Sequence, residues 1–73
     1  MNMHEYKSFG DNLKRIRKER NLTLEEMANL TGTIKQVLSH YERYERIPSV
    51  VMAIKIAKGL NVPITELIFD KDE

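Results

Sequence analysis

The sequence predicts an all-α fold, a compact bundle of five short helices in one domain. Apolar residues recur at helical spacing in five segments, and Gly, Pro or Asn separates these segments. No stretch alternates apolar and polar residues as a half-buried strand would. Because 73 residues suffice for a single core only, we expect one domain over 1–73, with its core over 9–68 and flexible ends over 1–7 and 70–73.

The first helix is predicted over residues 8–20. Ser8 is a plausible N-cap, and Asn21 can end the helix because Asn tolerates a left-handed backbone. The apolar side of the helix consists of Phe9, Leu13 and Ile16.

The second helix is predicted over 24–30. Thr23, followed three residues later by Glu26, forms a capping box, in which each side chain binds a backbone amide that the helix leaves unpaired. Gly32 then breaks the chain. The expected inward residues are Leu24, Met27 and Ala28.

The third helix is predicted over 34–43, and its start has two interpretations. Thr33 with Gln36 forms a capping box, whereas a shift of one residue makes Ile34 the N-cap, and Ile is a poor cap. We favour Thr33. The apolar side consists of Val37, Leu38 and Tyr41.

Two further helices complete the prediction. One follows Ser49 over 50–59, and a short one follows Pro63 over 64–68. The former is expected to have Val50, Ala53, Ile54, Ala57 and Leu60 on one face, and the apolar contacts of the latter come from Ile64, Leu67 and Ile68.

Charge and composition favour some classes of function over others. The formal net charge is only +1, but residues 1–21 carry six Lys or Arg against three Asp or Glu, and a nucleic-acid footprint is a local patch. There is no Cys, so disulfides cannot stabilise the domain, which favours a partner subunit. The longest apolar run, 50–54, is too short to span a bilayer, and we expect a cytoplasmic protein without membrane contact.

Catalysis is not expected. His4 and His40 do not form a metal pair, and no cluster of His and carboxylates has metal-ligand spacing. Ser39 and His40 are neighbours on a helix, so their side chains diverge and cannot act as nucleophile and base. We expect no enzyme activity, metal, cofactor or small-molecule ligand.

Residues 22–49 have the outline of a helix-turn-helix. A capped short helix, a turn at 31–33 centred on Gly32 and a second short helix follow one another. In such a motif the first helix lies across the DNA phosphates, and the second projects into the major groove. Helical hairpins with a Gly turn are common, so the outline alone is not specific.

The specific signal is a resemblance that covers residues 9–68. Residues 22–32 (LTLEEMANLTG), 38–43 (LSHYER) and 46–49 (RIPS) resemble the phage-repressor and Cro-type helix-turn-helix family. The flanks 9–17 and 54–68 are similar to that family's first and last helices. The resemblance implies a lambda-repressor-like DNA-binding domain with 34–43 as its recognition helix. It also implies that double-stranded DNA is the partner.

The resemblance implies a role for individual residues. It matches Arg17 and Glu42 to an ion pair between the first and third helices, which would fix the angle of the recognition helix. The expected base contacts come from Lys35, Gln36, Ser39 and His40. The expected phosphate contacts come from Thr23, Thr33, Arg43, Tyr44 and Arg46.

Three positions depart from the family pattern. Leu24 stands where relatives often have a Gln that contacts the DNA backbone, and Leu cannot make that contact. Ile34 stands where a hydroxyl cap is common. Tyr44 stands where Gly is usual, so either it bears the steric cost of a left-handed helix end or the helix ends differently. Its hydroxyl could donate to a phosphate, although surface packing is the commoner fate.

A homodimer and a repressor are the expected assembly and function. Four apolar residues exceed what a small core needs and could form a self-complementary interface: Val51, Met52, Ile68 and Phe69. A two-fold dimer requires a near-palindromic operator. The alternative is a protein-interaction module of the same fold, an antitoxin or an antagonist of a related regulator, which the departures at 24 and 44 would favour.

Overall fold

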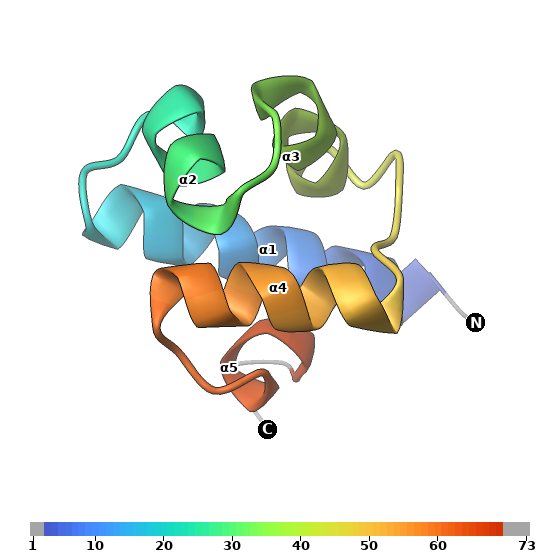
Figure 1. Ribbon diagram of the computed structural model, residues 1–73. Helices are drawn as coiled ribbons and strands as arrows, with labels where there is room; N and C mark the ends of the chain where they lie inside the picture. Colours follow the sequence, from blue (N-terminus) through green and yellow to red (C-terminus); the bar gives the residue numbers. More distant parts are fainter. Residues whose placement is uncertain (1–2, 70–73) are drawn as a thin grey trace.

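The computed structural model describes the backbone of residues 3–69 and the side chains of residues 8–69. Within this range the chain forms five helices and no strand: α1 (Met3–Glu19), α2 (Leu24–Thr31), α3 (Lys35–Glu42), α4 (Val50–Leu60) and α5 (Thr65–Ile68). The pair α2 and α3 lies on one side of α1 and α4, and α5 lies on the opposite side (Figure 1). The predicted all-α bundle is confirmed.

The core draws on every helix. The fully buried side chains are Leu13, Met27, Leu38, Ile56, Leu60 and Leu67. Phe9 of α1 meets Tyr41 of α3 edge to face, with ring centroids 5.5 Å apart. This geometry is the one that the quadrupoles of two aromatic rings favour, so the contact fixes α1 against α3.

The start of α1 differs from the expectation. The helix begins at Met3, so Ser8 is not its N-cap but a buried residue within the helix. The other end follows the prediction, because Asn21 has a left-handed backbone with φ of 56°. The expected flexibility of 1–7 stays a prediction, and residues 70–73 lie outside the described range.

The start of α3 corrects a second expectation. Its N-cap is Ile34, which has an extended backbone and no capping side chain, and not Thr33. The hydroxyl of Thr33 lies 2.8 Å from the hydroxyl of Thr31 and so shares a hydrogen bond with that residue. Because the hydroxyl of Thr33 is hydrogen-bonded to Thr31 of α2, the Thr33 side chain does not cap the amides of α3. The carbonyl of Ile34 still accepts the first helical bonds, from Val37 and Leu38.

The face of α4 that enters the core differs in part from the predicted one, since Ala53, Ala57 and Leu60 are buried as expected. Ile56 is fully buried, whereas Val50 and Ile54, both expected to point inward, are exposed. Ser49 does begin this helix, because its hydroxyl accepts a hydrogen bond from the amide of Met52. In α5, likewise, Leu67 is buried and Ile68 is exposed. As a result, the apolar side chains of Val50 and Ile68 lie on the surface.

Two glycines permit close helix contacts. A Cβ at Gly59 of α4 would lie 2.6 Å from the carbonyl oxygen of Leu30 and from Cα of Thr31. A Cβ at Gly10 of α1 would lie 2.5 Å from the carbonyl oxygen of Tyr41. Real Cβ atoms do not approach backbone atoms so closely. The packing of α4 on α2 and of α1 on α3 therefore requires Gly at these positions.

Candidate nucleic-acid interface

The turn between α2 and α3 sets their relative direction. At the start of α2, the Thr23 hydroxyl accepts a hydrogen bond from the amide of Glu26, and the carboxylate of Glu26 accepts one from the amide of Thr23. The capping box that the sequence predicts is thus formed. At its end, Gly32 adopts φ of 70° and ψ of 30°, a left-handed conformation that costs Gly little. The chain then turns into α3 (Figure 1).

A bidentate ion pair supports α3 from the side of α1. Nε of Arg17 lies 2.8 Å from Oε2 of Glu42, and a second guanidinium nitrogen lies 3.0 Å from Oε1. The remaining guanidinium nitrogen donates to the carbonyl of Leu22 at 3.2 Å. The hydrogen bond to Glu42 raises the pKa of Arg17 above its ordinary value. Planar, two-point contacts of this kind restrict rotation, so the pair sets the angle of α3.

The face of α3 away from the core carries hydrogen-bonding side chains. Lys35 and Gln36 are exposed, and Ser39 and His40 are half-buried. These four residues, together with Leu24 and Arg43, line a shallow concavity of about 280 Å³ between the start of α2 and α3. The structure therefore brings the four residues expected to contact bases to one continuous surface.

Glu45 holds two residues at the end of this surface. Nδ1 of His40 lies 2.7 Å from Oε1 of Glu45, and a guanidinium nitrogen of Arg43 lies 3.1 Å from the same oxygen. The hydrogen bond from His40 is the main cause of a pKa for Glu45 below its ordinary value. No sequence pattern pointed to this residue. It lies beyond the end of α3, five positions from His40, where helical spacing predicts no contact.

Tyr44 combines an unusual backbone with a specific partner. Its φ of 63° is left-handed, as its place at a Gly position suggested. Its hydroxyl donates to the carboxylate of Asp11 on α1, and that bond is the main cause of a raised pKa for the phenol. The ring lies against Gly10. The structure thus directs this side chain to α1, through a contact across 33 residues that spacing cannot reveal.

The other residues expected to contact phosphates lie before α2, between α2 and α3, and after α3. Thr23 is exposed at the start of α2, and a helix N-terminus favours anions because its first amides lack helical partners. Thr33 is half-buried and hydrogen-bonded to Thr31. Arg46 is exposed in the segment after α3. Burial raises the pKa of Tyr41 above its ordinary value, and the positive charge of Arg46 partly opposes this effect.

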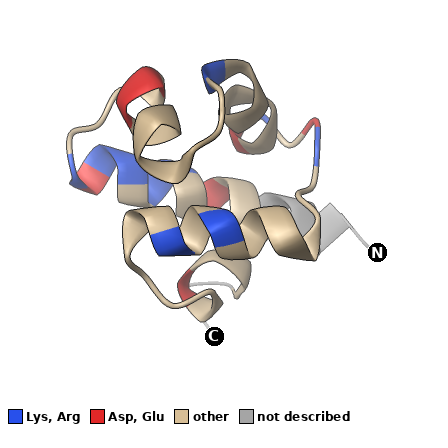
Figure 2. Ribbon diagram, in the orientation of Figure 1, with Lys and Arg blue, Asp and Glu red and all other residues tan. Residues whose placement is uncertain are grey.

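Charge is unevenly distributed over these helices. Figure 2 shows basic residues along the second half of α1 and at the start of α3, with acidic residues at the start of α2. The acidic pair in the first turn of α2 is Glu25 and Glu26. Of the six residues that line the concavity between α2 and α3, two are basic and none is acidic. The two cations, Lys35 and Arg43, suit a polyanion, and the carboxylate of Glu45 offsets part of this charge by binding Arg43.

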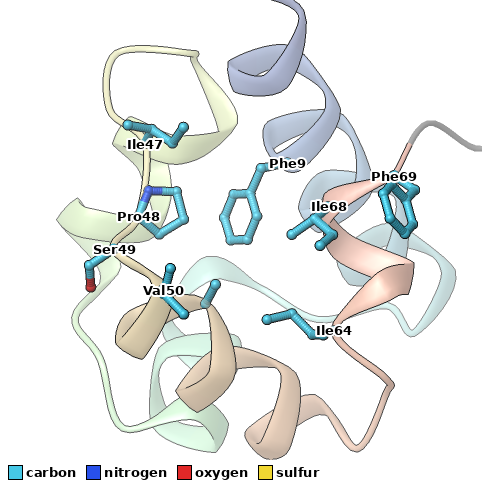
Figure 3. Close-up of a pocket in the computed structure, with 9 residues that line it drawn as sticks. Phe9, Ile47, Pro48, Ser49, Val50, Ile64, Ile68 and Phe69 are labelled. Carbon is cyan, nitrogen blue, oxygen red and sulfur yellow. The ribbon is translucent and has the colours of Figure 1, made fainter. Parts of the chain in front are cut away.

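The four residues expected at a dimer interface do not form one uniform patch. Ile68 and Phe69 line an apolar groove of about 420 Å³, together with Phe9, Ile47, Pro48, Ser49, Val50, Ala53 and Ile64. In Figure 3, Pro48 and Val50 lie on one side of the Phe9 ring, and Ile64 and Ile68 lie on the other. Val51 is 76% exposed but does not line this groove, and Met52 is half-buried against the core. The place of Val50 in the groove was not predicted.

The described residues contain neither a candidate metal site nor a candidate membrane span. No group of three or more His, Asp or Glu side chains in that range is arranged to hold a metal ion. Likewise, none of the described helices is both long and apolar enough to cross a membrane.

A capped helix, a left-handed turn and a second helix with an outward polar face define a helix-turn-helix protein. The chain belongs to the helix-turn-helix family of the Cro/C1 type, whose family model, described as helix-turn-helix, matches residues 13–67. The resemblance inferred from the sequence is therefore confirmed.

Several curated proteins are similar to this chain. It is 39% identical over 67 residues to the uncharacterised HTH-type transcriptional regulator y4dJ of Sinorhizobium fredii, covering 92% of this chain and 87% of that protein. It is 43% identical to the HTH-type transcriptional regulator SutR of Escherichia coli, over 77% of this chain but only 32% of SutR. It is 36% identical to the cryptic phage CTXphi transcriptional repressor RstR of Vibrio cholerae, over 88% of this chain and 58% of RstR.

Solved structures have the same fold. The restriction-modification controller protein C.AhdI of Aeromonas hydrophila is 29% identical with a TM-score of 0.81, over 89% of this chain and 94% of that one. A helix-turn-helix transcriptional regulator of Vibrio cholerae is 34% identical with a TM-score of 0.85, over 89% of this chain and 36% of that one.

Proposed function

We propose that this protein is a transcriptional regulator that binds double-stranded DNA by placing the outward face of α3 in the major groove. The observation that carries the proposal is the continuous polar face of α3, which has no acidic lining residue and is supported by the Arg17–Glu42 pair. A rigid helix with outward donors has the shape and chemistry that major-groove readout needs. Membership of a family of transcriptional regulators supports the same function.

Within this proposal, the residues divide by role. Gln36 suits adenine, to which it can bind through two hydrogen bonds, and Lys35 can donate to N7 or O6 of guanine. Ser39 and His40 are shorter or partly buried and complete the base-facing surface. Thr23, Thr33, Arg43, Tyr44 and Arg46 are the proposed phosphate contacts. Tyr44 would have to leave Asp11, or to bind a phosphate while keeping that bond.

Selection of bound duplexes from a random pool tests the proposal directly. We expect enrichment of one near-palindromic sequence. Gln36→Ala should then weaken binding to that duplex by roughly 1–3 kcal/mol and relax the preference at one base pair. Lys58→Ala is the matched control, because Lys58 is also exposed but lies on α4 outside the concavity. If Gln36→Ala and Lys58→Ala leave affinity and preference equally unchanged, α3 does not read the bases.

We also propose that the regulator acts as a homodimer through the surface around α4 and α5. Three of the predicted interface residues are exposed: Val51 by 76%, Ile68 by 41% and Phe69 by 57%. Ile68 and Phe69 also line the apolar groove. Exposed apolar side chains on a small domain favour association with a complementary surface, and a two-fold partner presents the same groove. Such a dimer would place its two copies of α3 one turn of DNA apart, about 34 Å.

Sedimentation equilibrium can test the dimer. Phe69→Glu should shift the protein toward the monomer and weaken operator binding, because two linked half-sites bind more tightly than one. Leu30→Glu is the control, since Leu30 is 52% exposed on α2, away from the groove. A wild-type chain that sediments as a monomer at tens of micromolar, alone and on DNA, would contradict the proposed dimer.

Repression is the proposed regulatory outcome, and one observation favours an alternative function. The relative RstR is named a repressor, and a small dimer on an operator can block a promoter by occupancy. The alternative is a protein-interaction module, favoured by the carboxylate of Glu45 beside two proposed DNA contacts. A salt titration against random duplex DNA separates them. A regulator loses affinity with a log–log slope of about −0.9 per neutralised phosphate, whereas an interaction module shows no binding even at low salt.

A further inference from the structure

Leu24 occupies an unusual place for an apolar residue. It is the first residue of α2, directly after the N-cap Thr23, and its side chain is half-buried against the core. Its outer surface lines the concavity of about 280 Å³ in front of α3. The departure from the family pattern at this position therefore falls on the proposed DNA-facing surface itself.

The other lining residues surround this apolar spot with hydrogen-bond donors. They are Lys35, Gln36, Ser39, His40 and Arg43. Each can donate a hydrogen bond and none is a carboxylate, so the rim is complementary to base edges and phosphates. Leu24 is the one apolar member of the lining. A ligand group that rests on Leu24 itself is therefore favoured to be apolar, and the rim favours an otherwise polar, anionic molecule to carry it.

Only one group in the major groove meets that description. Base edges there present hydrogen-bond donors and acceptors, and the exception is the methyl group on C5 of thymine. A cytosine methylated at C5 presents the same group. The concavity is also well placed to receive it, because Gln36 and Lys35 on the same rim are the proposed contacts to bases.

We propose that Leu24 is a specificity-determining residue, which forms the floor of a pocket for the 5-methyl group of a pyrimidine base. This inference rests on the proposed DNA binding and adds a preference that the polar residues of α3 cannot supply. Burial of the methyl group against Leu24 removes apolar surface from water on both partners. Leu in place of Gln thus removes one means of binding a phosphate and adds a base preference.

A methyl scan of the selected duplex tests the inference. Each thymine is replaced in turn by uracil, which removes only the methyl group, and each cytosine by 5-methylcytosine, which adds one. We expect one position in each half-site where the methyl group strengthens binding about fourfold, the factor that corresponds to about 0.8 kcal/mol for a buried methyl group. Weaker binding with uracil identifies thymine as the source, and stronger binding with 5-methylcytosine identifies the modified base.

Three variants assign the effect to Leu24. In Leu24→Ala the methyl dependence at that position should fall below twofold, while the other positions keep theirs. Ile34→Ala is the control, because Ile34 is an exposed apolar residue beside α3 that does not line the concavity, and it should keep the full dependence. Leu24→Met preserves the apolar volume and should keep both the fold and the dependence, which covers the case in which Leu24→Ala unfolds.

The outcomes separate the two proposals. If a duplex is enriched but no methyl substitution changes its binding to the wild-type chain more than twofold, the inference about Leu24 is wrong and the proposed function stands. The same holds if Leu24→Ala keeps the full methyl dependence. If no duplex is enriched and none binds at low salt, the proposed function is wrong and this inference fails with it.

Discussion

Removal of Arg17 should destabilise the whole domain, because it leaves a buried carboxylate without its partner. The Glu42 side chain is only 7% exposed, and Arg17 is 17% exposed. Arg17→Met removes both guanidinium hydrogen bonds to Glu42, together with the one to the carbonyl of Leu22. The methyl thioether keeps the packing of the stem but offers no donor.

The expected cost follows from this burial. Removal of one partner from a buried ion pair costs about 3–5 kcal/mol, mostly as the penalty of the charge left behind. Since water can reach the edge of Arg17, we expect the lower end, about 3 kcal/mol. For a domain of this size each kcal/mol lowers Tm by about 4–8 °C, so Tm should fall by about 12–24 °C. The double variant Arg17→Met/Glu42→Leu removes both charges and should lie within about 1.5 kcal/mol of wild type.

Urea unfolding, followed by circular dichroism, measures all of these quantities in a double-mutant cycle. Lys14→Ala is the control on the same helix, because Lys14 is exposed, and it should change stability by less than about 0.5 kcal/mol. A coupling energy of about 2 kcal/mol or more between Arg17 and Glu42 is expected. The reasoning is refuted if Arg17→Met costs no more than Lys14→Ala, or if the double variant costs as much as the two single variants together.

Three further predictions concern other contacts. Gly59→Ala should lower the free energy of unfolding by about 1–3 kcal/mol in urea, because its Cβ would lie 2.6 Å from the Leu30 carbonyl oxygen. Folding raises the pKa of Tyr44, so the contribution of this residue to stability is fully present below the unfolded pKa of about 10 and is lost as pH rises through the folded pKa. In thermal melts at alkaline pH, Tyr44→Phe should therefore lose less stability than wild type as pH rises. Glu45→Gln should strengthen DNA binding and steepen the salt slope by up to about 0.9, because it frees Arg43.

Much of the fold could be predicted from the sequence because its signals are local. The capping box at Thr23 and Glu26, the left-handed Asn21 and the Gly32 turn each depend on residues within a few positions. Their geometry is the one that the residue types favour in isolation. The family resemblance then supplied the fold type and the candidate recognition face, because the local signals could not distinguish a helix-turn-helix from an ordinary helical hairpin.

The errors arose where local signals were ambiguous or a distant contact decided. In α4, Val50, Ile54 and Ile56 are all apolar, so helical spacing fits two faces, and only packing against the other helices selects Ile56. At the start of α3, Thr33 has the better capping side chain, but its hydroxyl is already shared with Thr31. In both places tertiary context overrode a reasonable local preference.

The inward and outward residues of α3 have separate proposed roles. The inward residues of the helix and the Arg17–Glu42 pair hold its position, so a change there alters folding and DNA binding together. Lys35 and Gln36 are exposed, and the described contacts give their side chains no hydrogen bond within the protein. Substitutions at these two positions should therefore change base preference while stability stays within about 0.5 kcal/mol. Leu24 has both roles, because one side of its side chain packs on the core and the other lines the concavity. Its replacement should therefore affect both the stability of the domain and its base preference.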